Sequence, residues 1–222
     1  MSPEEGQFQA VARSSRKPSS SMVGKLEPFS IVRGQFVRGR NLDRLTQARL
    51  ERSFPGLLAD LFVLAHGSYL LELFRSCVPY RQAARGPFRL LLLALEGLEG
   101  GIKPAIVCRW AEIHLLAGLG YAPQLDECVL CARSDRLTGF SPGAGGVLCA
   151  ACAAERSLAM APPVLACLRF LARSRLDGAA RLRQPADQAR RVRQILAAHF
   201  QEHWPSRPDP ERMLRAWGCE EG

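Results

Sequence analysis

Two Cys-x-x-Cys pairs constrain this chain more than any other feature. The first pair is Cys128 and Cys131, the second is Cys149 and Cys152, and 17 residues separate them. A two-residue gap lets the chain turn back so that both sulfurs of a pair face one ion, and the spacer suits a hairpin that returns the second pair to the first. A glycine-rich stretch, residues 143–146, precedes the second pair. The pattern predicts a structural Zn²⁺ site with four thiolate ligands.

Other roles for these four cysteines stay open. The alternatives to a zinc site are two redox-active pairs, two disulfides or an iron–sulfur cluster, since four thiolates alone do not exclude iron. The first thirty residues contain no secretory apolar region, and no run reaches the roughly 18–20 apolar residues of a membrane span. A catalytic metal is disfavoured because four sulfurs close its coordination shell. Cys77, Cys108 and Cys167 fall on apolar helix faces, where we expect buried, structural thiols.

Positive charge is concentrated at both ends of the chain. The 222 residues carry a formal net charge of +9; residues 10–55 contain ten basic and three acidic residues, and residues 169–222 contain eleven and seven. Such segregation is typical of a protein with a polyanionic partner, most often nucleic acid, although arginines also occupy ordinary solvated faces. The candidate phosphate-binding residues are Arg13, Arg16, Lys17, Lys25, Arg33, Arg38 and Arg40. A second candidate patch contains Arg169, Arg173, Arg175, Arg181, Arg183, Arg190, Arg191 and Arg193.

Hydrophobic periodicity divides the chain into two predicted domains of an α+β protein. Residues 1–53 favour strands, at about 7–12, 28–38 and 42–50, with Gly34 as a candidate bulge. Residues 54–222 favour helices, interrupted at about 124–158 by the cysteine module. The expected helices cover about 57–78, 88–98, 104–119, 162–175 and 185–204.

A few aromatic and histidine positions carry further predictions. Phe29 and Phe36 lie in apolar runs and are expected in the core of the β domain, with base stacking as the alternative. His199 and His203, four residues apart, are expected on a solvated helix face. The sequence contains no nucleophile motif, phosphate-binding loop or paired carboxylates, so it does not favour an enzyme.

Five stretches resemble one known family in their order and spacing. They are residues 10–18 (AVARSSRKP), 26–30 (LEPFS), 38–48 (RGRNLDRLTQA), 125–131 (LDECVLC) and 140–152, which begins FSPGAGGVLC. The sequence is similar here to the RecO family of bacterial DNA repair and recombination proteins. The resemblance implies an N-terminal OB fold and a C-terminal helical domain that carries a zinc-finger-like module.

The resemblance also implies a cytoplasmic, non-enzymatic recombination mediator. Proteins of this family bind single- and double-stranded DNA and anneal complementary strands. They work with RecR, sometimes RecF, and the single-stranded-DNA-binding protein to help RecA load. The main alternative is a protein–protein adaptor whose zinc module docks a partner, with incidental DNA binding. A metal-dependent nuclease would need clustered carboxylates, which the sequence lacks.

The chain departs from the family pattern at two places. Family members usually have about two more strands before the stretch that matches residues 8–12, so we expect a truncated barrel if Met1 is the true start. The family also often has glycine after the first Cys-x-x-Cys pair, where this chain has Ala132. A left-handed backbone at that position would be strained in alanine.

Overall fold

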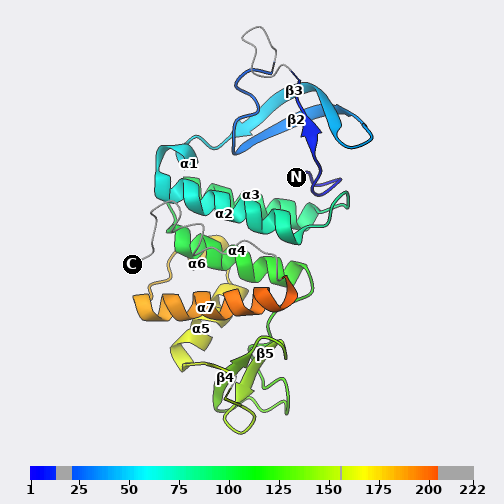
Figure 1. The fold of residues 1–222 in the computed structure, drawn as a ribbon. Coiled ribbons are helices and arrows are strands. Elements are labelled where there is room, and N and C mark those ends of the chain that lie inside the picture. Colours follow the sequence, from blue (N-terminus) through cyan, green and yellow to red (C-terminus); the bar gives the residue numbers. More distant parts are fainter. Residues whose placement is uncertain (14–21, 156, 205–222) are drawn as a thin grey trace.

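The computed structural model describes residues 1–13, 22–155 and 157–204. Figure 1 shows an elongated stack with a small sheet at one end, helices in the middle and a second small sheet at the other end. The mixed α+β architecture predicted from the sequence is confirmed.

The N-terminal sheet has three described strands in the order β1-β3-β2. β1 (Ala10–Val11) pairs in parallel with β3 (Asp43–Ser53), and β2 (Ser30–Val37) pairs antiparallel with β3. β1 is shorter than the predicted strand at 7–12, whereas β2 and β3 match the other two predictions closely. The described strands form an open, twisted sheet, and the helices lie beneath it in Figure 1.

The helices follow the predicted apolar periodicity, with two differences. The described helices are α1 (Gly56–Ala59), α2 (Leu61–Cys77), α3 (Arg85–Glu99), α4 (Pro104–Gly118), α5 (Pro162–Arg173), α6 (Leu176–Ala179) and α7 (Ala186–His203). The predicted first helix is divided because the Asp60 carboxylate caps α2 by accepting hydrogen bonds from the N–H groups of Phe62 and Val63. α6, a single turn, was not predicted. Within the described ranges, none of the helices combines the length and apolar character that a bilayer span requires.

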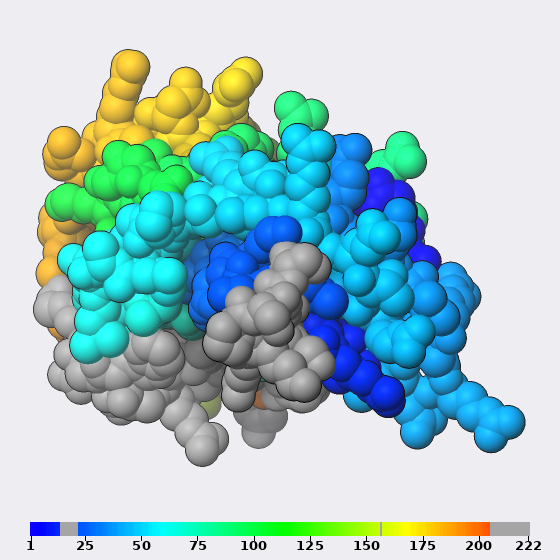
Figure 2. All heavy atoms as spheres, turned by 90° about the horizontal axis from the view of Figure 1, so that it is seen from above, coloured from blue at the N-terminus to red at the C-terminus, as the bar shows by residue number. Residues whose placement is uncertain are grey.

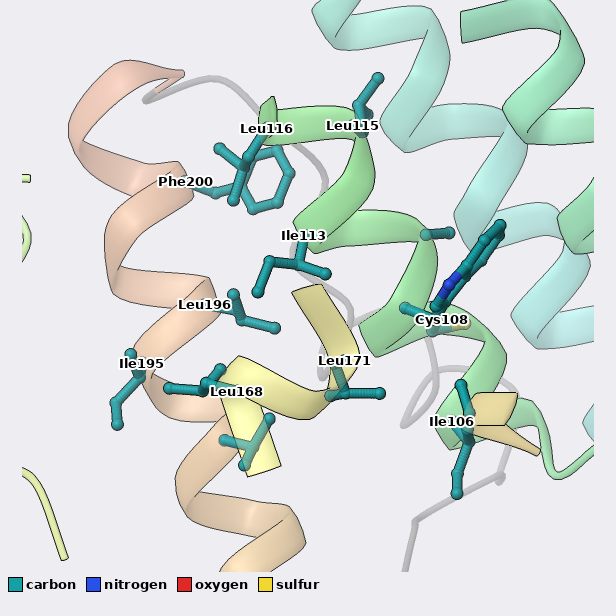
Figure 3. Packing of buried hydrophobic residues seen from close by; sticks show 14 of the residues in the cluster. Ile106, Cys108, Ile113, Leu115, Leu116, Leu168, Leu171, Ile195, Leu196 and Phe200 are labelled. Atoms are coloured by element: carbon teal, nitrogen blue, oxygen red, sulfur yellow. The ribbon is translucent and has the colours of Figure 1, made fainter. Parts of the chain in front are cut away.

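One hydrophobic core joins the helices, with α4 at its centre. Ile113 of α4 points toward Leu196 of α7, and Leu116 lies against Phe200 (Figure 3). Leu168 of α5 closes the same cluster from below. All five side chains are at most 2% exposed. The prediction that Cys77, Cys108 and Cys167 are buried is confirmed.

A clasp attaches the N-terminal sheet to the helical body. The loop between α2 and α3 hydrogen-bonds residues 3–9: the Arg81 N–H donates to the Gln7 carbonyl at 3.0 Å, and the Gln7 side chain donates to Val78 at 2.6 Å. Arg81 also reaches Glu5 at 2.9 Å and Asp43 of β3 at 2.6 Å. The backbone approaches so closely that a Cβ on Gly6 would lie 2.2 Å from the Gln82 carbonyl oxygen. This clasp holds the exposed sheet against the helices.

Candidate metal centre and basic sheet

The four paired cysteines converge in the second sheet module. The Sγ atoms of Cys128, Cys131, Cys149 and Cys152 all lie within 4.8 Å of one another. The Cys131 and Cys149 sulfurs are 3.6 Å apart, close to the ~3.8 Å edge of a tetrahedron with metal–sulfur bonds of ~2.3 Å. The seven cysteines within the described ranges form no disulfide. The donor set and its geometry therefore fit a thiolate-bound metal ion.

Backbone hydrogen bonds shape both cysteine turns. In the first, the Ala132 N–H donates to the Cys128 carbonyl at 2.8 Å, and Ala132 has a φ of 59°. The left-handed backbone anticipated here is present, at the cost of strain that glycine would avoid. In the second, the Ala153 N–H donates to the Cys149 carbonyl at 2.9 Å. Each turn thus aims both of its sulfurs at one point.

A short hairpin brings the two turns together. β4 (Leu137–Ser141) pairs with β5 (Gly146–Cys149) and β6 (Leu158–Ala159) in the order β5-β4-β6. The Val129 N–H donates to the Val147 carbonyl at 3.0 Å, which ties the first turn to β5. Gly146 is needed at this crossing, because a Cβ there would lie 2.4 Å from the Gln124 carbonyl oxygen. The glycine-rich stretch therefore serves close packing as well as turning.

The electrostatics of the four thiols favour a bound cation. Backbone N–H groups, first that of Cys149 and then those of Leu130 and Cys131, lower the pKa of Cys128 to about 6. The neighbouring thiols of Cys131 and Cys149 raise the pKa of Cys152 to about 12. The Cys128 thiol therefore ionises readily, whereas the Cys152 thiol resists ionisation next to the other sulfurs. A divalent ion would offset that repulsion and hold all four as thiolates.

Polar and aromatic contacts fasten the module to the helices. Arg169 of α5 donates to the Leu125 carbonyl at 2.9 Å, and Arg173 pairs with Asp126 at 2.6 Å. Phe140 of β4 packs edge-on against His199 of α7, with ring centroids 5.7 Å apart. The predicted solvent exposure of His199 is wrong: it is 1% exposed, and its Nε2 lies 2.9 Å from the Tyr121 carbonyl oxygen.

Five of the seven candidate phosphate-binding cations, including Arg33, lie within the described residues. Arg13 and Arg40 are exposed. Lys25 donates to the Ala48 carbonyl at 3.3 Å, and Arg38 pairs with Glu5 at 3.2 Å while its side chain stays 75% exposed. Arg16 and Lys17 lie outside the described residues. The positions of these side chains do not test whether they contact phosphate, so their DNA-binding role stays a prediction.

The strand register reveals two cations that the candidate set omitted, Arg44 and Arg49. Arg33 and Arg49 are directly opposite each other on β2 and β3, next to the Gln35–Gln47 pair. Arg33 is paired with Glu51 at 2.7 Å. Arg40, Arg44 and Arg49 are exposed and make no ion pair with another described residue. The alternation of polar and apolar residues along 44–51 indicates this surface in the sequence, because it places Gln47 and Arg49 on one face of the strand. Figure 2 looks down on this end of the molecule, where the blue atoms of the sheet form a projecting surface.

The second predicted basic patch divides into internal and exposed residues. Arg169 and Arg173 hold the module, and Arg191 donates to the Ala159 carbonyl at 3.0 and 2.8 Å. The exposed members are Arg173, which also pairs with Asp126, and Arg175, Arg181, Arg183 and Arg190. About half of this patch therefore serves the packing of the helical domain.

No second group of three or more His, Cys, Asp or Glu side chains with metal-binding spacing occurs in the described part of the chain. The one cluster present has four sulfur ligands, which fill a tetrahedral shell without leaving room for substrate. Its chemistry is that of a structural site.

Comparisons with known proteins match two family models to this chain. The family described as "Recombination protein O N terminal" matches residues 1–54, and "Recombination protein O C terminal" matches residues 58–212. A protein of Desulforudis audaxviator named DNA repair protein RecO is 33% identical over 97% of this chain and 87% of its own length. The protein of that name from Symbiobacterium thermophilum is 38% identical over 68% of this chain, and the match spans 62% of that relative. This chain belongs to the RecO family of DNA repair proteins.

Proposed function

We propose that this chain is a non-enzymatic recombination mediator that binds DNA strands through its N-terminal sheet and promotes their annealing. The observation that carries the proposal is the set of three exposed arginines, Arg44 and Arg49 on β3 and Arg40 in the turn before it, that form no ion pair with the residues the structure describes. Side chains in this state can neutralise phosphates and release the counterions bound to DNA. Membership of a DNA repair family makes nucleic acid the natural polyanion.

Annealing requires two negatively charged strands to approach each other. The sheet, a partial OB fold in this proposal, would hold one strand. The exposed arginines of the helical domain, Arg175, Arg181, Arg183 and Arg190, would neutralise the second strand or a duplex. Cations on both bodies would lower the repulsion between the strands and so speed their pairing.

Zn²⁺ is the metal that we assign to the cysteine site. It is a structural ion bound by Cys128, Cys131, Cys149 and Cys152, because it accepts four thiolates in a closed tetrahedral shell and has no redox chemistry. Its role is to pin residues 124–158 against α5 and α7. RecR, the single-stranded-DNA-binding protein, RecF and RecA are the partners proposed from the family.

A titration of labelled oligonucleotides at several salt concentrations tests the DNA-binding proposal. Each lost phosphate contact changes the slope of log K against log salt for single strands by about 0.7. The triple substitution Arg40→Gln, Arg44→Gln and Arg49→Gln should therefore make the slope less steep by about 2. The matched control removes the same charge by Arg85→Gln, Arg89→Gln and Arg136→Gln, three exposed arginines to which no DNA contact is assigned, and should leave the slope unchanged. Equal slopes for the sheet triple and the unaltered protein would refute the proposed interface.

One observation favours the adaptor as a second candidate. Leu130, between the first two cysteines, is 64% exposed, as suits a side chain that docks on a partner protein. The same titration separates the two functions, because the incidental DNA binding of an adaptor would not depend on the arginines of the sheet. Retention of partner binding by the sheet triple, together with undiminished DNA binding, would favour the adaptor.

A further inference from the structure

The two phenylalanines of the β domain have different environments. Phe29 is 7% exposed and packs its ring against α2, where a Cβ on Gly67 would lie 3.0 Å from its Cε1 atom. Phe36 of β2 is 40% exposed, so the prediction that it belongs to the core is wrong. Its ring meets Phe8 edge-on, with centroids 5.0 Å apart and planes at 90°. The sheet therefore presents one supported aromatic ring to its surroundings.

Local backbone features bring the Phe36 ring close to the backbone of its own strand. The register shifts between Gln35 and Phe36, because Thr46 of β3 has no register partner on β2, and such a bulge increases the local twist of the strand pair. A Cβ on Gly34 would lie 3.0 and 3.1 Å from two atoms of the Phe36 ring, so only glycine lets the ring approach the backbone this closely. Leu45, the partner of Phe36 on β3, is buried next to it. Gly34 and Leu45 support the ring, and Phe8 braces its edge.

Two cations lie on segments next to the ring in the sheet. The Lys25 ammonium donates to the carbonyl of Ala48, the residue directly opposite Gly34. Arg38 follows Phe36 by two residues and reaches Glu5, three residues before Phe8. An aromatic surface between positive charges is the arrangement that holds single strands, because each base offers a π-face and each phosphate a charge.

We propose that Phe36, braced by Phe8, stacks against a base of single-stranded DNA and gives this sheet a preference for unpaired over paired strands. The inference rests on the proposed DNA-binding function and adds a strand preference to it. In a duplex each base is already covered by its neighbours, so the ring has no free base to contact. The cations bind the phosphates of single strands and of duplexes alike, whereas the ring distinguishes single strands from duplexes.

The test compares Phe36→Leu with Phe170→Leu. Phe170 of α5 is 42% exposed, which matches Phe36, but it lies on the helical domain. Three fluorescein-labelled probes of equal length are used: a single-stranded oligothymidine, a duplex, and an abasic strand that keeps the phosphates without bases. Leucine preserves the apolar bulk and removes the aromatic face.

Phe36→Leu should bind the oligothymidine about tenfold more weakly, the lower part of the range for loss of one base–aromatic contact. Binding of the duplex and the abasic strand should change less than twofold, and the salt slope should be unchanged. Phe170→Leu should match the unaltered protein with all three probes. An equal loss on all three would overturn the inference, because Phe36 would then act by shaping the sheet.

A second variant keeps the test independent of stability. Phe36→Trp preserves the aromatic face, so it should bind the oligothymidine at least as tightly as the unaltered protein, with indole fluorescence quenched by that probe and not by the abasic strand. Unchanged oligothymidine binding by Phe36→Leu would overturn the stacking alone. Failure of the unaltered protein to bind any probe would overturn the proposed function as well.

Discussion

A buried charge network between α2 and α4 offers a sharp test of how the helical core is stabilised. Glu112 is fully buried, and its Oε1 atom accepts hydrogen bonds from the Tyr69 hydroxyl at 2.5 Å and from Arg109 Nη2 at 2.7 Å. Tyr69 is 1% exposed and Arg109 is 5% exposed. The substitution Glu112→Gln keeps the shape of the side chain and removes its charge. The Arg109 guanidinium would then lose the charge of Glu112, its partner at 2.7 Å in the core.

The expected cost follows from this burial. Removing one partner of a buried ion pair destabilises a protein by roughly 3–5 kcal/mol, because the remaining charge is neither solvated nor neutralised. For a chain of about 200 residues this lowers the melting temperature by roughly 6–20 °C. Glu72→Gln is the matched control: Glu72 pairs with Arg75 on the surface of α2, where both side chains are at least 36% exposed. That change should cost less than about 1 kcal/mol.

Urea denaturation, followed by circular dichroism, measures both variants. A triple variant with Tyr69→Phe, Arg109→Met and Glu112→Leu removes every member of the network together. It should recover most of the stability lost in Glu112→Gln, since apolar replacement of a buried pair is often neutral. A loss below about 1 kcal/mol in Glu112→Gln, or a triple variant no more stable than it, would refute the reasoning.

The remaining predictions concern the module and the clasp. Chelation should release one Zn²⁺ per chain and lower the melting temperature while most helical dichroism persists; an unchanged melting temperature in metal-free protein would contradict a structural ion. Gly146→Ala should destabilise the protein by roughly 1–3 kcal/mol through its collision with the Gln124 carbonyl, whereas Gly143→Ala, whose Cβ would come no closer than 3.5 Å to another residue, should not. The hydrogen bond from Arg81 holds the pKa of Asp43 below its ordinary value, so the clasp should be intact above about pH 4 and weaken as the pH falls further. The melting temperature of Asp43→Asn should accordingly change less than that of the unaltered protein between pH 5 and pH 3, and parallel curves would exclude this role.

The helices and the cysteine site were accessible from the sequence because short-range rules determine them. Apolar residues at helical spacing predicted five helices, and the two Cys-x-x-Cys pairs predicted the sulfur cluster before any coordinates. Even the division at Asp60 had a local signal, since aspartate is a favoured N-cap. In each case the residues that decide the structure are near one another in sequence.

The errors arise where distant segments meet. His199 was assigned to a solvated face because two polar side chains share one side of α7, yet Phe140 of β4 covers it. The polar and apolar periodicity of α7 does not indicate that a module sixty residues earlier in the sequence packs against this helix. The second basic patch, on α5 and α7, is likewise not one exposed surface, because Arg169 and Arg191 donate hydrogen bonds to backbone carbonyls of other segments.

Phe36 shows why the surface that matters for binding was the hardest to predict. Strict alternation along 30–37 would place it with Gly34 and Val32 on the covered face of a regular strand. The missing side chain at Gly34 instead lets the ring approach the backbone closely while it stays 40% exposed. A glycine that weakens a strand in isolation thus creates room for an aromatic contact. If base stacking is confirmed there, the irregularity in β2 is the feature that gives the sheet its strand preference, and the arginines around it supply affinity without that preference.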